Sequence, residues 1–220
     1  IKPTCIGNSE MEQVTRKISS DVPGYACNMM EEEFGVPCMF CMPAAGDQIP
    51  KWVSHYQVLG EDGEPKVVDH SVAESLEKVA EQGRVMGEVC IEVAKRIKYD
   101  EDAIIGCSRT AYTWINRAGD GEVGVTVDGI IIGDDIALVG FKPEVNSITE
   151  KELWERSPYN HTLLISFMNG DQKYMPHDEA YDILTREVFR SGCGRGCAEE
   201  FVNVSVDMLN KAKKGEIGRA

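Results

Sequence analysis

The sequence lacks a long apolar run, and it has no cluster of basic residues. Its longest apolar stretches, such as residues 129–133, fall far short of the about 20 residues that cross a bilayer. Lysine and arginine number 23 against 37 acidic residues, which gives a net charge of -14. Because nucleic acids and anionic membranes bind basic surfaces, this acidic balance disfavours both of them as binding partners. We therefore expect no transmembrane segment and no nucleic-acid partner.

The rest of the composition is typical of a globular protein. The 220 residues are 42% hydrophobic and 27% charged, enough to form a buried core. Helical and strand patterns mix along the chain, which predicts an α/β (α+β) fold with mixed β-sheets flanked by helices. We expect one domain over residues 1–220, with possible halves 1–99 and 100–220. Since residue 1 is Ile rather than Met, we also expect this domain to be incomplete at its N-terminus.

Three helices are predicted from apolar spacing and end signals. The first covers residues 21–34, with Asp21 as its N-cap and a glycine after its end; the last covers residues 196–213. The strongest pattern, over residues 72–98, places apolar side chains on one stripe. Gly83 and Gly87 lie one turn apart there, either to let another backbone approach or as tolerated glycines.

The remaining segments predict strands and short helices. Gly133 to Asp135 would turn a hairpin. The expected strands are 36–42, 104–115, 123–132, 136–141 and 162–167, and the short helices are 149–156 and 178–184.

Eight cysteines allow several interpretations. Cys38 and Cys41 form a C-x-x-C within the expected strand 36–42, and Cys193 and Cys197 form a C-x-x-x-C. The first pair suits core thiols, a redox pair or half of a metal site. We interpret the cysteines as reduced thiols, which favours an intracellular, cytoplasmic setting.

Three oxygen-bearing side chains follow expected strands at turns. Asp47 lies in a small-residue turn, where α/β folds tend to build sites, although it could simply cap that turn. Glu144 emerges at a strand end and could bind a metal or face solvent. Tyr174 follows a turn and could be a metal ligand or a half-buried structural residue.

Other candidates come from the strands and helix starts. Arg109 could pair with Glu144 or Asp47, or hold a substrate carboxylate, or simply be exposed on its strand. His161 enters the strand that ends at residue 167, and His177 starts a short helix close to Tyr174. His177 is the better substitute ligand, and both have a structural alternative.

Four segments together resemble the neutral/alkaline non-lysosomal ceramidase family, whose members cleave amide bonds at a zinc site. They are residues 18–26 (ISSDVPGYA), 43–50 (PAAGDQIP), 139–144 (VGFKPE) and 169–176 (NGDQKYMP). The resemblance covers most of the chain and matches the C-terminal part of the family's catalytic domain. The form of the second segment is closer to bacterial members than to proven ceramidases.

The resemblance implies roles for several residues, and the sequence departs from the family at several positions, among them Pro143, which stands where the family has a glycine. The resemblance assigns zinc to Glu144 and Tyr174, where Lys173 replaces the family's glycine. Ile49 stands where the family has its nucleophilic serine, and Lys2 where it has a zinc-binding histidine.

We therefore expect a metal-dependent amidohydrolase that acts on linear C–N amide bonds, with a small-molecule or lipid-like amide as substrate. Asp47 would orient the attacking water and Arg109 would assist catalysis. Substrate would contact the loop glycine and two amides, and the two histidines would support the metal ligands through hydrogen bonds. These residues are Gly46, Gln48, Asn169, His161 and His177.

The departures keep an alternative open, namely a catalytically inactive ceramidase-like binding or regulatory protein. A companion N-terminal chain or a homo-oligomer would complete the zinc site in the first case. A zinc–thiolate protein built on Cys38 and Cys41 is a third possibility.

Overall fold

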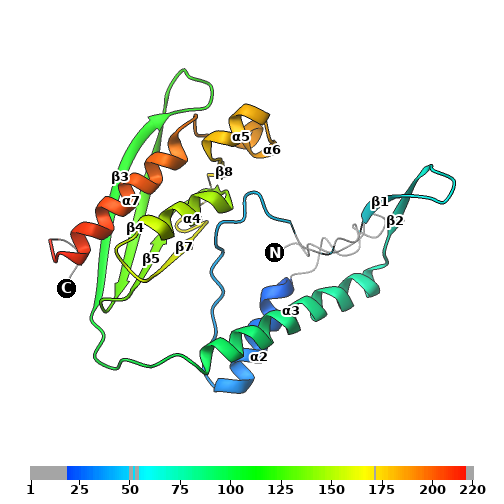
Figure 1. Cartoon of the computed structure of the whole chain (residues 1–220), viewed down its shortest axis with the longest axis horizontal. Coiled ribbons are helices and arrows are strands. Elements are labelled where there is room, and N and C mark those ends of the chain that lie inside the picture. Colours follow the sequence, from blue (N-terminus) through cyan, green and yellow to red (C-terminus); the bar gives the residue numbers. More distant parts are fainter. Residues whose placement is uncertain (1–18, 50–51, 53–54, 171, 217–220) are drawn as a thin grey trace. The chain divides into compact units, whose positions relative to one another are not determined.

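The computed structural model describes residues 19–49, 52, 55–170 and 172–216, and these residues form two compact units. One unit falls within residues 1–40 and 50–99, and the other within residues 41–49 and 100–220. Both contain helices and β-structure, which confirms the predicted α/β class with mixed sheets (Figure 1). No helix in the described part is long and apolar enough to cross a bilayer.

The first unit is built on two helices, α2 (Asp21–Phe34) and α3 (Val72–Ala94). Helix α2 ends as predicted at Gly35, which has the left-handed φ of 68° that glycine adopts easily. Its N-cap is Ser20, so the prediction of Asp21 as the cap is wrong by one residue. Helix α3 begins with a capping box, in which the side chains of Ser71 and Glu74 each accept the other's backbone N–H.

The two glycines of α3 bring α2 close. A Cβ atom on Gly83 would lie 2.3 Å from the Cβ of Tyr25, and one on Gly87 would lie 2.8 Å from the Sδ of Met29. Any larger residue at these positions would meet a neighbouring side chain. Of the two interpretations left open by the sequence, these distances therefore support the one in which the glycines let α2 approach closely.

A hairpin completes this unit and was missed in the sequence. Strand β1 (His55–Leu59) pairs antiparallel with β2 (Pro65–Asp69) across the exposed turn that follows Gly60. The predicted strand at residues 36–42 is wrong, because this stretch pairs with no other strand and Met39 is 83% exposed. The thiols of this stretch are likewise not core thiols, since Cys41 is exposed and Cys38 is only partly buried.

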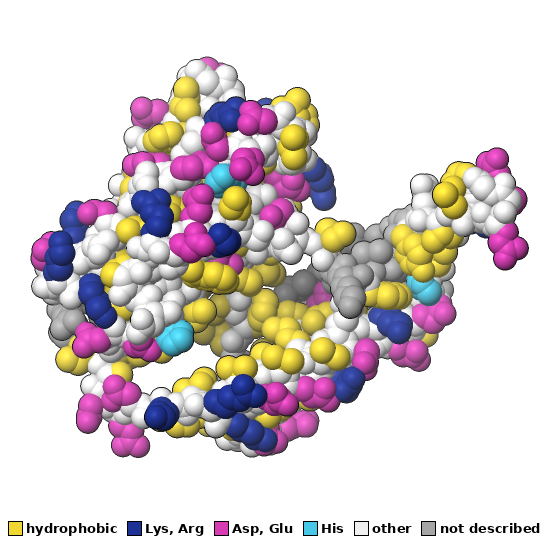
Figure 2. All heavy atoms as spheres, in the orientation of Figure 1, with side chains coloured by type: hydrophobic (Ala, Val, Ile, Leu, Met, Phe, Trp, Pro, Cys, Tyr) yellow, Lys and Arg dark blue, Asp and Glu magenta, His cyan; other side chains and the backbone are white. Residues whose placement is uncertain are grey.

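The second unit contains a four-stranded sheet in the order β3-β4-β5-β7. The first three strands are antiparallel neighbours, and β7 lies parallel to β5. The strands are β3 (Ile105–Ile115), β4 (Glu122–Ile132), β5 (Ile136–Gly140) and β7 (His161–Ile165). The predicted hairpin between β4 and β5 is confirmed. On the face drawn in Figure 2, acidic and basic side chains are interspersed over both units.

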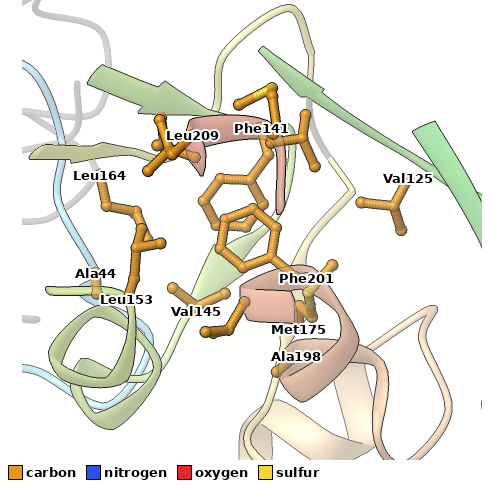
Figure 3. Packing of buried hydrophobic residues seen from close by; sticks show 14 of the residues in the cluster. Ala44, Val125, Phe141, Val145, Leu153, Leu164, Met175, Ala198, Phe201 and Leu209 are labelled. Atoms are coloured by element: carbon orange, nitrogen blue, oxygen red, sulfur yellow. The ribbon is translucent and has the colours of Figure 1, made fainter. Parts of the chain in front are cut away.

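Two helices pack on the sheet and enclose the core. Helix α7 (Cys197–Lys213) packs on β3 and β4, while α4 (Ser147–Arg156) packs on α7 and β7. At the centre, the rings of Phe141 and Phe201 stack with their centroids 4.2 Å apart (Figure 3). Both side chains are fully buried, together with Leu153, Leu164, Met175 and Leu209.

A smaller parallel pair lies beyond the end of β5. Strand β6 (Glu144–Val145) pairs with β8 (Tyr174–Met175), and Ser191 forms isolated bridges with residues 173 and 174. Two short helices, α5 (Asp178–Ile183) and α6 (Arg186–Arg190), connect β8 to Ser191. This ribbon carries the side chains considered next.

Candidate functional site

The structure brings Glu144 and Tyr174 together. They are direct partners in the parallel register of β6 and β8, and the N–H of Glu144 donates to the carbonyl oxygen of Lys173 at 2.8 Å. In-register residues on neighbouring strands lie on the same side, with the strands about 4.8 Å apart. Since the next pair, Val145 and Met175, is fully buried, strand alternation turns Glu144 and Tyr174 to the opposite side.

That side borders a cavity of about 280 Å³. Its lining consists of Glu144, Phe167, Lys173, Tyr174 and Arg190. A second cavity of about 300 Å³ adjoins it and shares Lys173 and Arg190. The cavity therefore combines two oxygen donors, an aromatic wall and two cations.

The loop before Tyr174 adopts an unusual backbone. Phe167, Asn169 and Lys173 have φ angles of 60°, 61° and 62°, although none is glycine. Each such conformation costs on the order of 1 kcal/mol for an L residue, and such residues cluster at functional sites. The left-handed φ of Lys173 also explains why a glycine suits this position in the family that the sequence resembles.

Asp47 is held at the start of α4 rather than projecting freely. Its carboxylate accepts hydrogen bonds from the backbone N–H and the hydroxyl of Ser147, both at 2.8 Å. Burial of the carboxyl opposes ionisation, but these bonds outweigh it and lower the pKa of Asp47 below its ordinary value. The arrangement holds the loop at Asp47 to the helix that follows β6.

The neighbours of Asp47 support the same attachment. The N–H of Gly46 donates to the carbonyl oxygen of Val145 at 2.8 Å, and a Cβ on Gly46 would lie only 2.9 Å from that oxygen. The side-chain amide of Gln48 donates to Asp47 at 3.2 Å. Gly46 thus permits the close approach of the loop to β6, next to Glu144.

Arg109 lies in a different ion pair from those expected. Its Nε atom is 2.5 Å from Oδ1 of Asp128, and its side chain is 67% exposed. The side-chain amide of Asn169 donates to the other oxygen of Asp128 at 2.9 Å. Of the alternatives left open by the sequence, pairing with Glu144 or Asp47 is therefore wrong, and an exposed position on the strand agrees with the structure. Asp128 had one sequence signal, because it is the one charged side chain between Val123 and Ile132.

The two histidines lie close to carboxylates of other elements. His161 opens β7 opposite Ile136, at the end of the sheet remote from Glu144, and its Nε2 is 3.5 Å from Asp135. His177 is the N-cap of α5, and its Nε2 lies 3.2 Å from Glu199. Helices α4 and α7 therefore supply the carboxylates around His177, among them Glu152 at 3.4 Å.

The donor set of this chain fits a zinc ion only in part. Within residues 19–49, 52, 55–170 and 172–216, no three His, Cys, Asp or Glu side chains gather into a metal-binding group. Catalytic zinc sites commonly have three protein ligands, and here Glu144 and Tyr174 supply two. Lys2 lies outside the described residues. Ile49 is 83% exposed and has no nucleophilic atom.

Comparison with known proteins gives a match at the level of structure alone. No family model and no curated protein matches the sequence. A solved structure described as neutral ceramidase from Pseudomonas aeruginosa superposes with a TM-score of 0.64 over 96% of this chain, at 12% identity. The chain has a ceramidase-like fold.

A second structure, described as ceramidase complexed with C2, agrees. It matches with a TM-score of 0.63 over 92% of this chain, at 11% identity. This chain spans 43% of each of these two proteins, less than half their length.

Sequence reasoning missed Arg190 as a cavity residue. An exposed arginine at the end of a short helix carries no pattern of its own. The only available signal was its position two residues before Gly192 in a turn-rich stretch, which is too common to use.

Proposed function

We propose that this chain forms part of a metal-dependent hydrolase of linear amide bonds, with Glu144 and Tyr174 as its contribution to a zinc site. The observation that carries the proposal is their in-register pairing at the edge of one cavity. The ceramidase-like fold supports the reaction class.

The two side chains suit a hard or borderline cation because both offer oxygen atoms. When bound, zinc acts as a Lewis acid toward an amide carbonyl and makes water more acidic. The other donors would come either from a companion N-terminal segment or from another copy of the chain.

Asp47 would act as a positioning residue in this proposal. Both of its carboxylate oxygens already accept hydrogen bonds from Ser147. By fixing the loop against β6, Asp47 and Gly46 would hold Glu144 in place. Phe167 offers an apolar surface for the acyl part of a small or lipid-like amide.

A non-catalytic binding protein is the second candidate function. Two observations favour it: the described residues supply only two zinc donors, and Ile49 occupies the position of the expected nucleophile. The same cavity would then bind an amide without cleaving it.

Zinc binding tests the proposal directly. The protein would be purified as it occurs, any companion chain would be identified by intact-mass spectrometry, and zinc affinity would be measured by calorimetry. Losing a residue that only hydrogen-bonds to a metal ligand typically weakens metal binding by about 10- to 100-fold. Glu144→Gln or Tyr174→Phe removes a ligand itself and should weaken zinc binding by more than that.

Matched controls are available in exposed turns of the same chain. Glu101→Gln and Tyr99→Phe change the same residue types at exposed positions and should leave zinc affinity unchanged. If Glu144→Gln binds zinc as tightly as the unmodified protein, the proposed site is wrong. Hydrolysis of a fluorogenic N-acyl amide then separates the enzyme from the non-catalytic binder.

A further inference from the structure

The cavity at Glu144 and Tyr174 has a basic wall. Of its five lining residues, Lys173 and Arg190 are cations, and both also line the adjoining cavity. Acidic residues outnumber basic ones in this chain, whose net charge is -14, so two cations in one small lining differ from the average surface. The lining thus has two cations against one carboxylate, that of Glu144, and this net positive charge favours an anionic group there.

The backbone explains how Arg190 reaches the cavity. It is the last residue of α6, and the next residue, Ser191, bridges to Lys173 and Tyr174. The β-bridges therefore fix Arg190 beside the segment that carries Tyr174. Among the described residues, the Arg190 guanidinium has no hydrogen bond or ion pair with another side chain.

Lys173 reaches the cavity from a strained position. Its φ of 62° is one that glycine adopts without cost. A glycine here would give the same loop without the strain, but it would also leave the cavity without this ammonium group. Lys173 therefore places an ammonium group at a position where the backbone conformation favours glycine.

We propose that the anionic group is a carboxylate of the substrate itself, so that the site takes N-acyl amino acids. This inference rests on the proposed function of the same cavity. In an N-acyl amino acid, one carbon separates the amide nitrogen from the carboxylate. In the proposed arrangement the amide lies at Glu144 and Tyr174 and the carboxylate lies at Arg190 and Lys173, all of which line the same cavity of about 280 Å³.

The chemistry of each group fits its position. The planar guanidinium of arginine binds a carboxylate through two parallel hydrogen bonds, and lysine adds a point charge. Phe167 would contact the acyl chain. Hydrolysis would consume one water, break the C–N bond, and release the acyl group as a carboxylate and the amino acid with a free amine.

Binding of two matched probes to the full-length protein tests this assignment. N-octanoylglycine carries the carboxylate, and N-octanoylglycine amide replaces it with a neutral group of similar shape. We expect calorimetry to show about 10- to 100-fold tighter binding of the acid, because hydrogen bonds to charged groups are the stronger ones.

Variants of α6 then locate the effect. Arg190→Gln should remove most of the preference for the acid, whereas Arg186→Gln, an exposed arginine in the same helix, should retain it. Lys173→Gly should also reduce the preference while relieving the backbone strain, so it should not lower thermal stability.

The outcomes separate this inference from the proposed function. Acid-selective binding that depends on Arg190 supports the inference even when no hydrolysis is seen. Hydrolysis of neutral amides with equal binding of both probes supports the proposed function and overturns the inference. Tighter binding of octyl phosphate than of N-octanoylglycine, or the same loss in Arg186→Gln as in Arg190→Gln, also overturns it.

Discussion

The two units of this chain reach stability in different ways. The second unit has a continuous core between its sheet and two helices, centred on the stacked rings of Phe141 and Phe201. The first unit buries few large side chains, and α2 and α3 meet at the glycines of α3. The candidate cavity belongs to the unit with the large core. A rigid core helps to hold two side chains of a site, such as Glu144 and Tyr174, in register.

The largest expected effect comes from removing a core ring of the second unit. Phe201 is fully buried, so Phe201→Ala should destabilise that unit by about 3–5 kcal/mol through lost burial and a new cavity. Relative to the unmodified protein, hydrogen exchange followed by mass spectrometry should accelerate more in α7 and the sheet than in α3. Phe189→Ala, at a 61% exposed position, is the matched control and should change little. Equal effects of the two variants would contradict the assigned core.

A smaller effect is expected where the helices of the first unit meet. A Cβ on Gly83 would also lie 2.9 Å from the backbone oxygen of Val22, so Gly83→Ala must push α2 away. Overpacking costs about 1–3 kcal/mol, and the gain in helix propensity offsets up to about 1 kcal/mol. Amide exchange in α2 should therefore accelerate.

Gly87→Ala sharpens the comparison within the same helix. The nearest atom to its new Cβ is the Sδ of Met29, which belongs to a flexible side chain and can move. Its effect on amide exchange should be clearly smaller than that of Gly83→Ala. A larger effect at Gly87 would show that α2 and α3 meet differently.

The smallest expected effect concerns the loop at Asp47 in the second unit. Loss of the two hydrogen bonds from Ser147 in Asp47→Ala should cost about 1 kcal/mol. Because the pKa of Asp47 is lowered in the folded protein, its contribution is present above the ordinary carboxyl pKa of about 3.9 and is lost as the pH falls through the lowered value.

Urea unfolding at a series of pH values checks this sign. The stability difference between the unmodified protein and Asp47→Asn should be largest near neutral pH and shrink in acid. Asp102→Asn, in an exposed turn, should show no such difference. A difference that grows as the pH falls would contradict the lowered pKa.

Much of the second unit could be predicted because its patterns are strong. Long alternating strands such as β3 and β4, with a glycine turn after β4, leave few alternatives. The prediction of a strand at residues 36–42 was wrong because a short apolar run does not reveal whether a partner strand exists. The hairpin of β1 and β2 was missed because its strands are short and carry polar residues.

The candidate site could be predicted only where a motif marked it. Glu144 and Tyr174 came from the resemblance, and no periodicity could have shown that they face each other. The ion-pair partner of Arg109 could not be predicted, because the sequence does not show which residue lies opposite it; that partner is Asp128 on the neighbouring strand. Arg190 required the fold itself, since only the bridges of Ser191 bring it to the cavity.

The parallel pairing of β6 and β8 has a consequence for how this protein can change over time. Insertions in the segment between the two strands can be absorbed by its helices and turns. A slip of the pairing by a single residue, however, would present Lys173 or Met175 to Glu144 in place of Tyr174. The length of the segment between β6 and β8 can therefore vary during evolution, whereas the register of the two paired residues cannot.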